Sequence, residues 1–165
     1  MEGYERLKHN AMYKLGRHAY TEQEMRKKLR EVSEDEEAIA AVIAWLLDHS
    51  FLCDANYTEN YIRQHKNLQK HSPRRIAAGL REKGIATDLI KLALEEDYSE
   101  EEALKIAQML LNKKFTRPCE EKVEALKQKQ KMYRFLQGRG FSSAVIMSVM
   151  QAKLEEFAEE IANIS

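Results

Sequence analysis

A serine, a proline and two arginines follow one another at residues 72–75 of the 165-residue chain. Ser72 before Pro73 is typical of a helix start, because proline suits the first helical position and a serine hydroxyl accepts a hydrogen bond from a free backbone amide. Arg74 and Arg75 then occupy the first turn. Guanidinium groups bind phosphates and carboxylates through paired hydrogen bonds. The segment therefore allows two interpretations, a surface that binds an anion or a pair of solvated charges.

Basic residues gather in parts of the chain, although 27 basic and 27 acidic residues cancel in total. Residues 57–86 contain seven Lys or Arg and two Asp or Glu, and residues 105–139 contain ten and three. Local potential rather than net charge attracts a polyanion, so a neutral chain can carry a basic stripe. The predicted binding residues are Arg26, Lys27, Lys28, Arg30, Arg63, Lys66, Arg74, Arg75, Arg81, Lys83, Lys127, Lys131 and Arg134.

Motifs for catalysis or metal binding are absent from the sequence. There is no glycine-rich phosphate loop, no GxSxG and no HExxH or CxxC pattern. Cys53 lies near His49, but one such pair is weak support for a metal site, and Cys53 with Cys119 does not make a disulfide framework. We therefore expect no enzymatic activity and no metal site.

The longest apolar run, AIAAVIAWLL at residues 38–47, is ten residues long. A membrane-spanning helix needs about 20. The N-terminal segment MEGYERLKHN has no apolar core of the kind that signal peptides carry. A cytoplasmic protein, monomeric when free, is expected.

Helix-forming residues dominate, and only two prolines and six glycines interrupt them, which predicts an all-α fold of about nine helices. Three capping boxes mark helix starts at Thr21–Glu24, Ser33–Glu36 and Ser99–Glu102. Further N-caps are predicted at Ser72, Thr87 and Ser142, and helix ends at Gly84, Gly138 and Gly140.

Three segments share one layout, in which a charged helix ends on leucine, the chain turns, and a capped apolar helix follows. They are LREVSEDEEAIAAVI (29–43), LREKGIATDLIKLAL (80–94) and LQGRGFSSAVIMSVM (136–150). This layout predicts three tandem three-helix, helix-turn-helix-like repeats at residues 1–53, 54–98 and 99–165. Stacking of such small units would give an elongated, curved solenoid with a long binding surface.

Helical spacing refines the candidate surface. Arg74 and Arg81 are seven residues apart and share one helix face, and Lys127, Lys131 and Arg134 form a line at i, i+4 and i+7. Val123, Leu126 and Tyr133 form the apolar face beside that line, and Tyr57, Tyr61 and Leu68 form the face of an earlier helix. The two tyrosines, close to Arg63 and Lys66, either stack bases or belong to the core. Gly79 in mid-helix allows a close contact or is simply tolerated.

Several stretches resemble the bacterial regulatory protein RecX family. FLCDANYTENYIRQH (51–65) followed by SPRRIAAGLREKGI (72–85) is similar to the family signature, with the Pro-Arg-Arg-Ile element as its most specific part. AYTEQEMRKKL (19–29) is similar to the first-unit pattern, and FLQGRGFSSAVIMSV (135–149) to the closing Arg-Gly-Phe element. Cys53, Thr58, Glu59 and Asn60 depart from the family pattern, which puts in doubt any basic contact expected there.

The resemblance implies three tandem three-helix repeats, no cofactor, and a role as negative modulator of the RecA recombinase. Such a protein binds in the groove of the RecA filament on single-stranded DNA and restrains ATP turnover, strand exchange and co-protease activity. Two alternatives stay open. A stand-alone helix-turn-helix nucleic-acid binder would bind DNA without a recombinase and with steep salt dependence. A helical interaction scaffold would neither bind DNA nor affect the recombinase.

Overall fold

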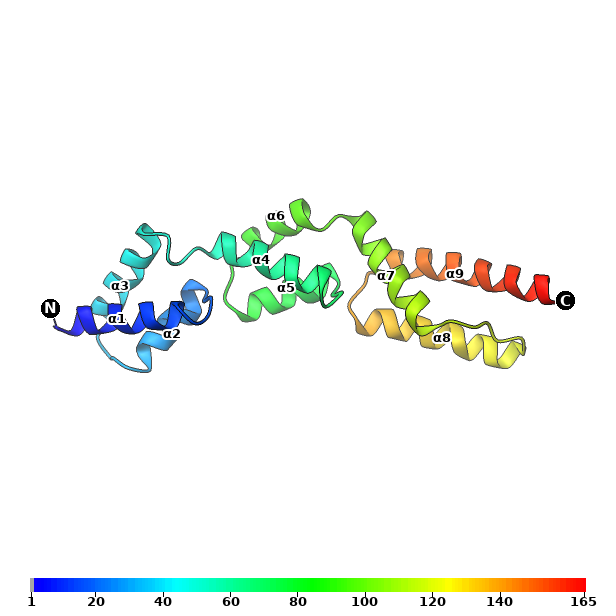
Figure 1. The fold of residues 1–165 in the computed structure, drawn as a ribbon, viewed down its shortest axis with the longest axis horizontal. Coiled ribbons are helices and arrows are strands. Elements are labelled where there is room, and N and C mark those ends of the chain that lie inside the picture. Colours follow the sequence, from blue (N-terminus) through cyan, green and yellow to red (C-terminus); the bar gives the residue numbers. More distant parts are fainter. Residues whose placement is uncertain (1) are drawn as a thin grey trace. The chain divides into compact units, whose positions relative to one another are not determined.

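The structure is a computed structural model that describes residues 2–165, and the regular elements of this range are all helices (Figure 1). They are α1 (Glu2–Leu15), α2 (Glu22–Arg30), α3 (Glu36–Asp48), α4 (Asp54–Asn67), α5 (Pro73–Glu82), α6 (Thr87–Asp97), α7 (Glu100–Lys114), α8 (Lys122–Gly138) and α9 (Ser143–Ile164). The prediction of an all-α fold with about nine helices is confirmed for the described residues.

Two compact units divide the chain. The first contains the residues up to Ile62 together with Ala77–Ala93, and the second contains Arg63–Ile76 together with Leu94–Ser165. Each of α4, α5 and α6 therefore contributes residues to both units. The ranges predicted for the three repeats are not the limits of these compact units, and they remain a prediction.

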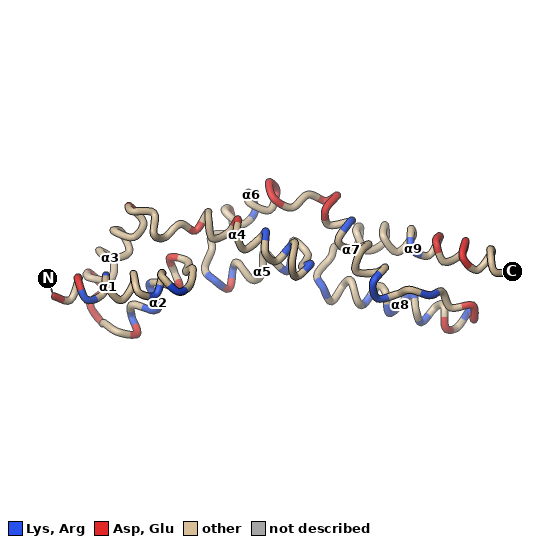
Figure 2. Tube along the Cα trace, in the orientation of Figure 1, with Lys and Arg blue, Asp and Glu red and all other residues tan. Residues whose placement is uncertain are grey.

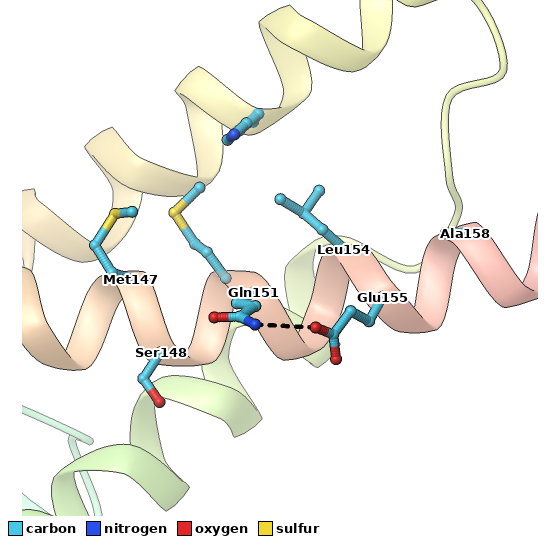
Figure 3. A pocket seen from close by; sticks show the side chains of 8 residues that line it. Met147, Ser148, Gln151, Leu154, Glu155 and Ala158 are labelled. Atoms are coloured by element: carbon cyan, nitrogen blue, oxygen red, sulfur yellow. Dashed lines mark hydrogen bonds between the residues drawn. The ribbon is translucent and has the colours of Figure 1, made fainter.

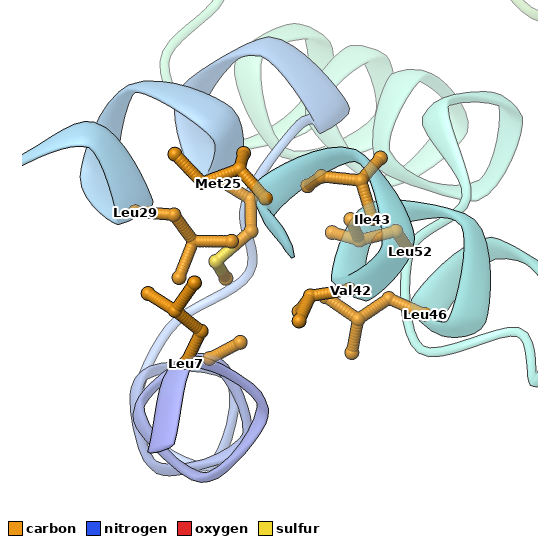
Figure 4. Packing of buried hydrophobic residues seen from close by; sticks show 9 residues of the cluster. Leu7, Met25, Leu29, Val42, Ile43, Leu46 and Leu52 are labelled. Carbon is orange, nitrogen blue, oxygen red and sulfur yellow. The ribbon is translucent and has the colours of Figure 1, made fainter. Parts of the chain in front are cut away.

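The core of the first unit lies where α1, α2 and α3 pack on one another. Figure 4 shows Leu7 of α1, Met25 and Leu29 of α2, and Val42 and Ile43 of α3 around a common centre. Each fully buried side chain of this kind contributes roughly 1.5–3 kcal/mol relative to an exposed one. The helical spacing of the apolar residues therefore translates directly into the packing of the unit.

The core of the second unit is organised by α9, which packs against both α7 and α8. Ile146 and Val149 of α9 are almost completely buried, as are Met132 and Leu136 of α8 and Leu111 of α7. In this unit too, the residues that recur at helical spacing face inward.

Most of the predicted helix starts are confirmed. Thr21 and Ser99 each form a complete capping box with the glutamate three residues later. Ser142 accepts a hydrogen bond from the amide of Val145, and Ser72 accepts one from the amide of Arg75. A side-chain oxygen thus satisfies a backbone donor that the helix leaves without a partner.

Two of these caps also reach a distant part of the chain. The Thr21 hydroxyl donates to the carbonyl oxygen of Lys83 at 2.6 Å, and the Ser72 hydroxyl donates to that of Arg139 at 2.8 Å. Both hydroxyl residues are fully buried. Each accepting residue precedes a glycine with positive φ, Gly84 at 81° and Gly140 at 86°. We call these two contacts the Thr21 link and the Ser72 link.

The glycines of the links are required for two reasons. Their positive φ lies in the region that favours glycine over residues with a Cβ atom. A Cβ atom at Gly140 would also lie 2.7 Å from the Ser72 hydroxyl oxygen, and one at Gly84 would overlap the side chain of Gln23. The turns therefore approach the helix starts as closely as their backbone permits.

Two predicted caps are wrong. Helix α3 begins two residues later than its predicted box, because Asp35 rather than Ser33 is the N-cap and accepts a hydrogen bond from the amide of Ala38 at 3.0 Å. Ser33 instead accepts a hydrogen bond from the amide of Asp35. Thr87 is the first residue of α6 rather than its cap. Aspartate caps a helix as well as serine does, so the sequence alone does not decide whether Ser33 or Asp35 is the N-cap.

Three residues assigned to apolar faces are exposed. Leu68 follows the last residue of α4 and is 77% exposed. Val123 and Leu126 in the first turns of α8 are 57% and 58% exposed, whereas Met132 and Leu136 further along the same helix are buried. Apolar spacing therefore continues in α8 beyond the stretch that the core covers.

Replacing Thr21 with valine tests the Thr21 link. The change removes the cap, which contributes about 1 kcal/mol, and leaves the buried Lys83 carbonyl without its donor. We expect the free energy of unfolding, measured by urea denaturation, to fall by about 2–3 kcal/mol. Ser99→Ala is the matched control, because it removes a capping box without a link, and should cost about 1 kcal/mol. Equal losses in the two variants would contradict a stabilising link.

Candidate polyanion interface

Three of the four predicted cations of α2 form ion pairs with nearby carboxylates. The ion pairs are Arg26–Glu22, Lys28–Glu31 and Arg30–Glu36, with N···O distances of 3.0, 3.0 and 2.6 Å. Arg30 makes a second hydrogen bond to Glu36 at 3.0 Å, and this pairing lowers the pKa of the Glu36 carboxyl. Lys27 is exposed and has no ion pair within residues 2–165. The charge available to a ligand on α2 is therefore smaller than the sequence indicates.

Lys83 forms part of the packing at the Thr21 link. Its ammonium group pairs with Glu24 at 2.9 Å, and the other oxygen of Glu24 accepts a hydrogen bond from the Thr21 amide. The hydrogen bond with Glu24 raises the pKa of the Lys83 ammonium group. Lys83 therefore holds the turn after α5 against the start of α2, in addition to any contact with a ligand.

Lys66 is also engaged within the fold. Only 13% of its side chain is exposed, and its ammonium group pairs with Glu102 at 2.9 Å. The same group donates to the carbonyl oxygen of Asp97, the last residue of α6. Lys66 thus connects the capping box of α7 with the end of α6, where the free carbonyl groups favour a cation.

The remaining predicted cations are exposed, and the described chain gives none of them an ion pair except Lys127, which pairs with Glu124 at 2.9 Å. Those without an ion pair are Arg63 of α4, Arg74, Arg75 and Arg81 of α5, and Lys131 and Arg134 of α8. Figure 2 shows basic residues along α8 and acidic residues toward the end of α9. These cations are the strongest candidates for contacts with an anion.

Tyr57 and Tyr61 are half-buried, and their rings stack with centroids 6.3 Å apart. The hydroxyl end of Tyr61 occupies the space that a Cβ atom at Gly79 would need. Burial raises the pKa of the Tyr57 hydroxyl. Gly79 is therefore explained by the close approach of Tyr61, and the packing of both rings favours the core interpretation over base stacking.

A basic cluster that the sequence analysis missed in part surrounds the Ser72 link. Arg75 and Arg139 are both attached to this link, and neither has an ion pair in the described chain. The guanidinium of Arg139 lies over the ring of Phe135 at 4.9 Å, and the ammonium group of Lys114 lies over the same ring at 4.2 Å. The buried Nε of Arg139 has no hydrogen-bond partner.

Arg139 and Lys114 were missed because neither belongs to a periodic helix face. Arg139 stands in the turn after α8, and Lys114 is the last residue of α7. The signal was the Arg-Gly-Phe element at residues 139–141, whose glycine marks a turn that closes on another part of the chain.

An apolar groove of about 500 Å³ lies along α9 (Figure 3). Met147, Leu154 and Ala158 line it on one side of α9, and Lys129 lines it from α8. Gln151 and Glu155 are joined by a hydrogen bond of 3.0 Å at its edge. Met147 is 58% exposed, so the groove is an apolar surface in contact with water.

His49 and Cys53 do not converge on a ligand site. The His49 ring is hydrogen-bonded to the carbonyl oxygen of Trp45 at 2.8 Å and stacks on the Trp45 ring. Within residues 2–165, no three His, Cys, Asp or Glu side chains gather in a way that would hold a metal ion. In the same range no helix combines the length and apolarity needed to cross a membrane.

Comparison with known proteins defines the class to which this chain belongs. Three family models match in tandem: the first three-helix domain of RecX at residues 8–46, the second at 54–94 and the third at 100–150. The class is therefore a regulatory protein made of three RecX three-helix domains.

Individual relatives agree. The regulatory protein RecX of Vibrio campbellii is 34% identical over 82% of this chain and 83% of its own length. That of Clostridium acetobutylicum is 32% identical over 82% of this chain, and the match spans 63% of that relative. The crystal structure of RecX from Lactobacillus salivarius shares the fold, with a TM-score of 0.81, 24% identity and coverage of 92% of this chain and 96% of that one. The chain belongs to the RecX family.

His71 makes the stability of the second unit depend on pH. Burial, and then the charges of Arg75, His65 and Arg139, lower the pKa of His71 below its ordinary value of 6.5. The Nδ1 atoms of His65 and His71 lie 3.1 Å apart, and the Tyr98 hydroxyl donates to the carbonyl oxygen of His71. A lowered pKa means that the unfolded chain binds more protons, so the folded state loses stability as pH falls through 6.5.

Denaturation of the wild type and of His71→Gln at about pH 7.5 and about pH 5.5 measures this effect. We expect the wild type to lose more stability than the variant between the two values, because glutamine does not titrate. A larger loss in the variant would contradict the sign of the effect.

Proposed function

We propose that this RecX-family protein is a negative modulator of the RecA recombinase, which binds in the groove of the RecA filament on single-stranded DNA. Binding there restrains ATP turnover, strand exchange and co-protease activity. Membership in the RecX family supports the choice of partner. The protein acts without a cofactor, as a monomer in the cytoplasm, and not as an enzyme.

One observation carries the proposal: exposed cations on α4, α5 and α8 that the described chain does not neutralise. A cation that already pairs with a carboxylate gives up that partner when a ligand binds, which offsets part of the gain. A cation without an ion-pair partner loses no such interaction when a ligand binds. We therefore expect Arg63, Arg74, Arg75, Lys131 and Arg134 to contribute more to filament binding than the paired cations of α2.

The groove along α9 supports a protein partner in addition to nucleic acid. Apolar surface exposed to water is usually covered by protein rather than by a phosphate backbone. Val123 and Leu126 at the start of α8 add exposed apolar area in the same unit. A nucleoprotein filament offers both kinds of surface, phosphates and protein, whereas naked DNA offers only the first.

Repetition of a similar three-helix domain suits a partner that is itself repetitive. Each domain of a repeat protein presents a related surface. Once one domain has bound a filament protomer, the other domains bind the neighbouring protomers with little further loss of translational and rotational entropy. A protein bound in this way holds neighbouring protomers in one arrangement. ATP turnover and strand exchange both require those protomers to move, so both slow down.

The test is ATP hydrolysis by the RecA protein of the same cell on single-stranded DNA, with this protein present at far less than one copy per protomer. Inhibition at that ratio is the expected result. Unchanged hydrolysis together with tight, salt-sensitive binding to naked DNA would support the stand-alone nucleic-acid binder instead. Unchanged hydrolysis without DNA binding would leave only a scaffold.

The double variant Arg74→Ala with Arg75→Ala locates the contact surface. Removal of two charge-assisted hydrogen-bonding groups should raise the concentration needed for half-inhibition by about tenfold to 100-fold. The control is Lys28→Ala with Arg30→Ala, which removes the same charge from two residues that are already paired. The control should retain nearly full inhibition. Equal behaviour of the two double variants would show that the contact surface lies elsewhere.

A further inference from the structure

The two links are built from the same hydrogen bonds, but the charged side chains beside them differ. In each, a buried cap hydroxyl binds the backbone three residues later and donates to the carbonyl before a glycine of positive φ. Position for position, Glu24 corresponds to Arg75, and Lys83 corresponds to Arg139. The same backbone arrangement therefore occurs twice in the chain, each time with a different pair of charged side chains.

At the Thr21 link the two positions hold an ion pair. Glu24 and Lys83 lie 2.9 Å apart, and this contact closes the turn onto the helix start. At the Ser72 link the carboxylate is replaced by a second arginine. Like charges repel, and no carboxylate within residues 2–165 forms an ion pair with either Arg75 or Arg139.

The two arginines are close enough to act on the same surroundings. The backbone of Arg75 approaches Gly140 so closely that a Cβ atom there would lie 3.6 Å from the Arg75 amide nitrogen. Both guanidinium charges lower the pKa of His71, which borders the link. Lys114, over the Phe135 ring beside Arg139, adds a third positive charge without an ion pair in the described chain.

We infer that Arg75, Arg139 and Lys114 form a phosphate-binding site at the Ser72 link, and that its ligand is the phosphodiester backbone of a nucleic-acid strand. A bound phosphate supplies the negative charge that Glu24 supplies at the Thr21 link. Arginine suits this role, because its planar fork donates two hydrogen bonds to phosphate oxygens. The inference goes beyond the proposed function, because it requires no recombinase.

The arrangement of neighbouring cations favours a strand over an isolated anion. Lys131, Phe135 and Arg139 follow one another at intervals of four residues at the end of α8, a rise of about 6 Å per step. Lys131 is exposed and also has no ion pair in the part of the chain described. A ligand with regularly repeated charges therefore meets a second cation as it leaves the site.

Arg75→Glu tests the site, because it recreates the charges of the Thr21 link. Without ligand, we expect a melting temperature about 2–4 °C above that of the wild type, since repulsion is replaced by attraction. Arg117→Glu is the control, with the same change of charge at an exposed residue in the turn after α7 that has no ion pair in the described chain. The control should leave the melting temperature nearly unchanged.

The same variants are compared for binding of a short fluorescein-labelled oligothymidylate, by anisotropy at several salt concentrations and without recombinase. We expect Arg75→Glu to weaken binding by at least about tenfold more than Arg117→Glu. The slope of its affinity against salt concentration should also fall by about 0.7 for each phosphate that the variant no longer neutralises. Arg139→Gln should weaken binding as well, and Arg75→Lys should largely preserve it.

Three results of these variant measurements would overturn the inference. The first is equal loss of affinity in Arg75→Glu and Arg117→Glu. The second is a melting temperature of Arg75→Glu no higher than that of Arg117→Glu. The third is equally tight binding of polyglutamate with the same dependence on Arg75, which would assign the site to an acidic protein.

NMR titration of His71 gives a second readout that does not depend on variants. Phosphate at the site offsets the charges of Arg75 and Arg139, so saturation with the oligothymidylate should raise the pKa of His71. A His71 pKa that does not change at saturation would place the bound strand elsewhere.

Discussion

The fold depends on two buried side-chain hydroxyl groups, each of which both accepts and donates a hydrogen bond. A cap hydroxyl ordinarily satisfies one amide at the start of its own helix. Thr21 and Ser72 accept such a bond and also donate to a carbonyl more than 60 residues further along the chain. Because each hydroxyl is fully buried, loss of either donor would leave a carbonyl without a partner in the protein interior. Glycines with positive φ allow the two backbones to come that close.

These links also explain why the compact units do not follow the repeats. Thr21 belongs to the first predicted repeat and Lys83 to the second, and Ser72 belongs to the second and Arg139 to the third. A three-helix domain of this size buries little apolar surface by itself. The middle repeat therefore divides its residues between two cores, and stability comes from contacts across repeats, as is usual in repeat proteins.

Much of the fold was predictable, since apolar spacing and caps are local signals. The core of α3 and the capping boxes at Thr21 and Ser99 were correct on these grounds. The state of the cations was only partly predictable. A pair such as Arg26–Glu22 follows from spacing of four residues, but the partner of Lys83 lies 59 residues away and that of Lys66 lies 36 away. The sequence also does not show where burial ends along a helix. Val123 has the spacing of a core residue, but it lies in a turn of α8 that the core does not cover.

A chain without net charge can therefore hold a strongly polarised surface. Many carboxylates serve caps and ion pairs, as Glu24, Glu36 and Glu102 do, and so remove positive charge from particular positions. Exposed ion pairs contribute only about 0–1 kcal/mol each, so they modestly weaken the potential of α2 without excluding a ligand. At the Ser72 link the position of the carboxylate is occupied by Arg75, and in the site that we infer the compensating charge comes from a bound phosphate. The adjacent arginines of the Pro-Arg-Arg-Ile element thus differ in their surroundings. Arg74 is exposed at the rim of a groove with Tyr98 and Phe141, whereas the backbone of Arg75 lies against the turn that carries Arg139.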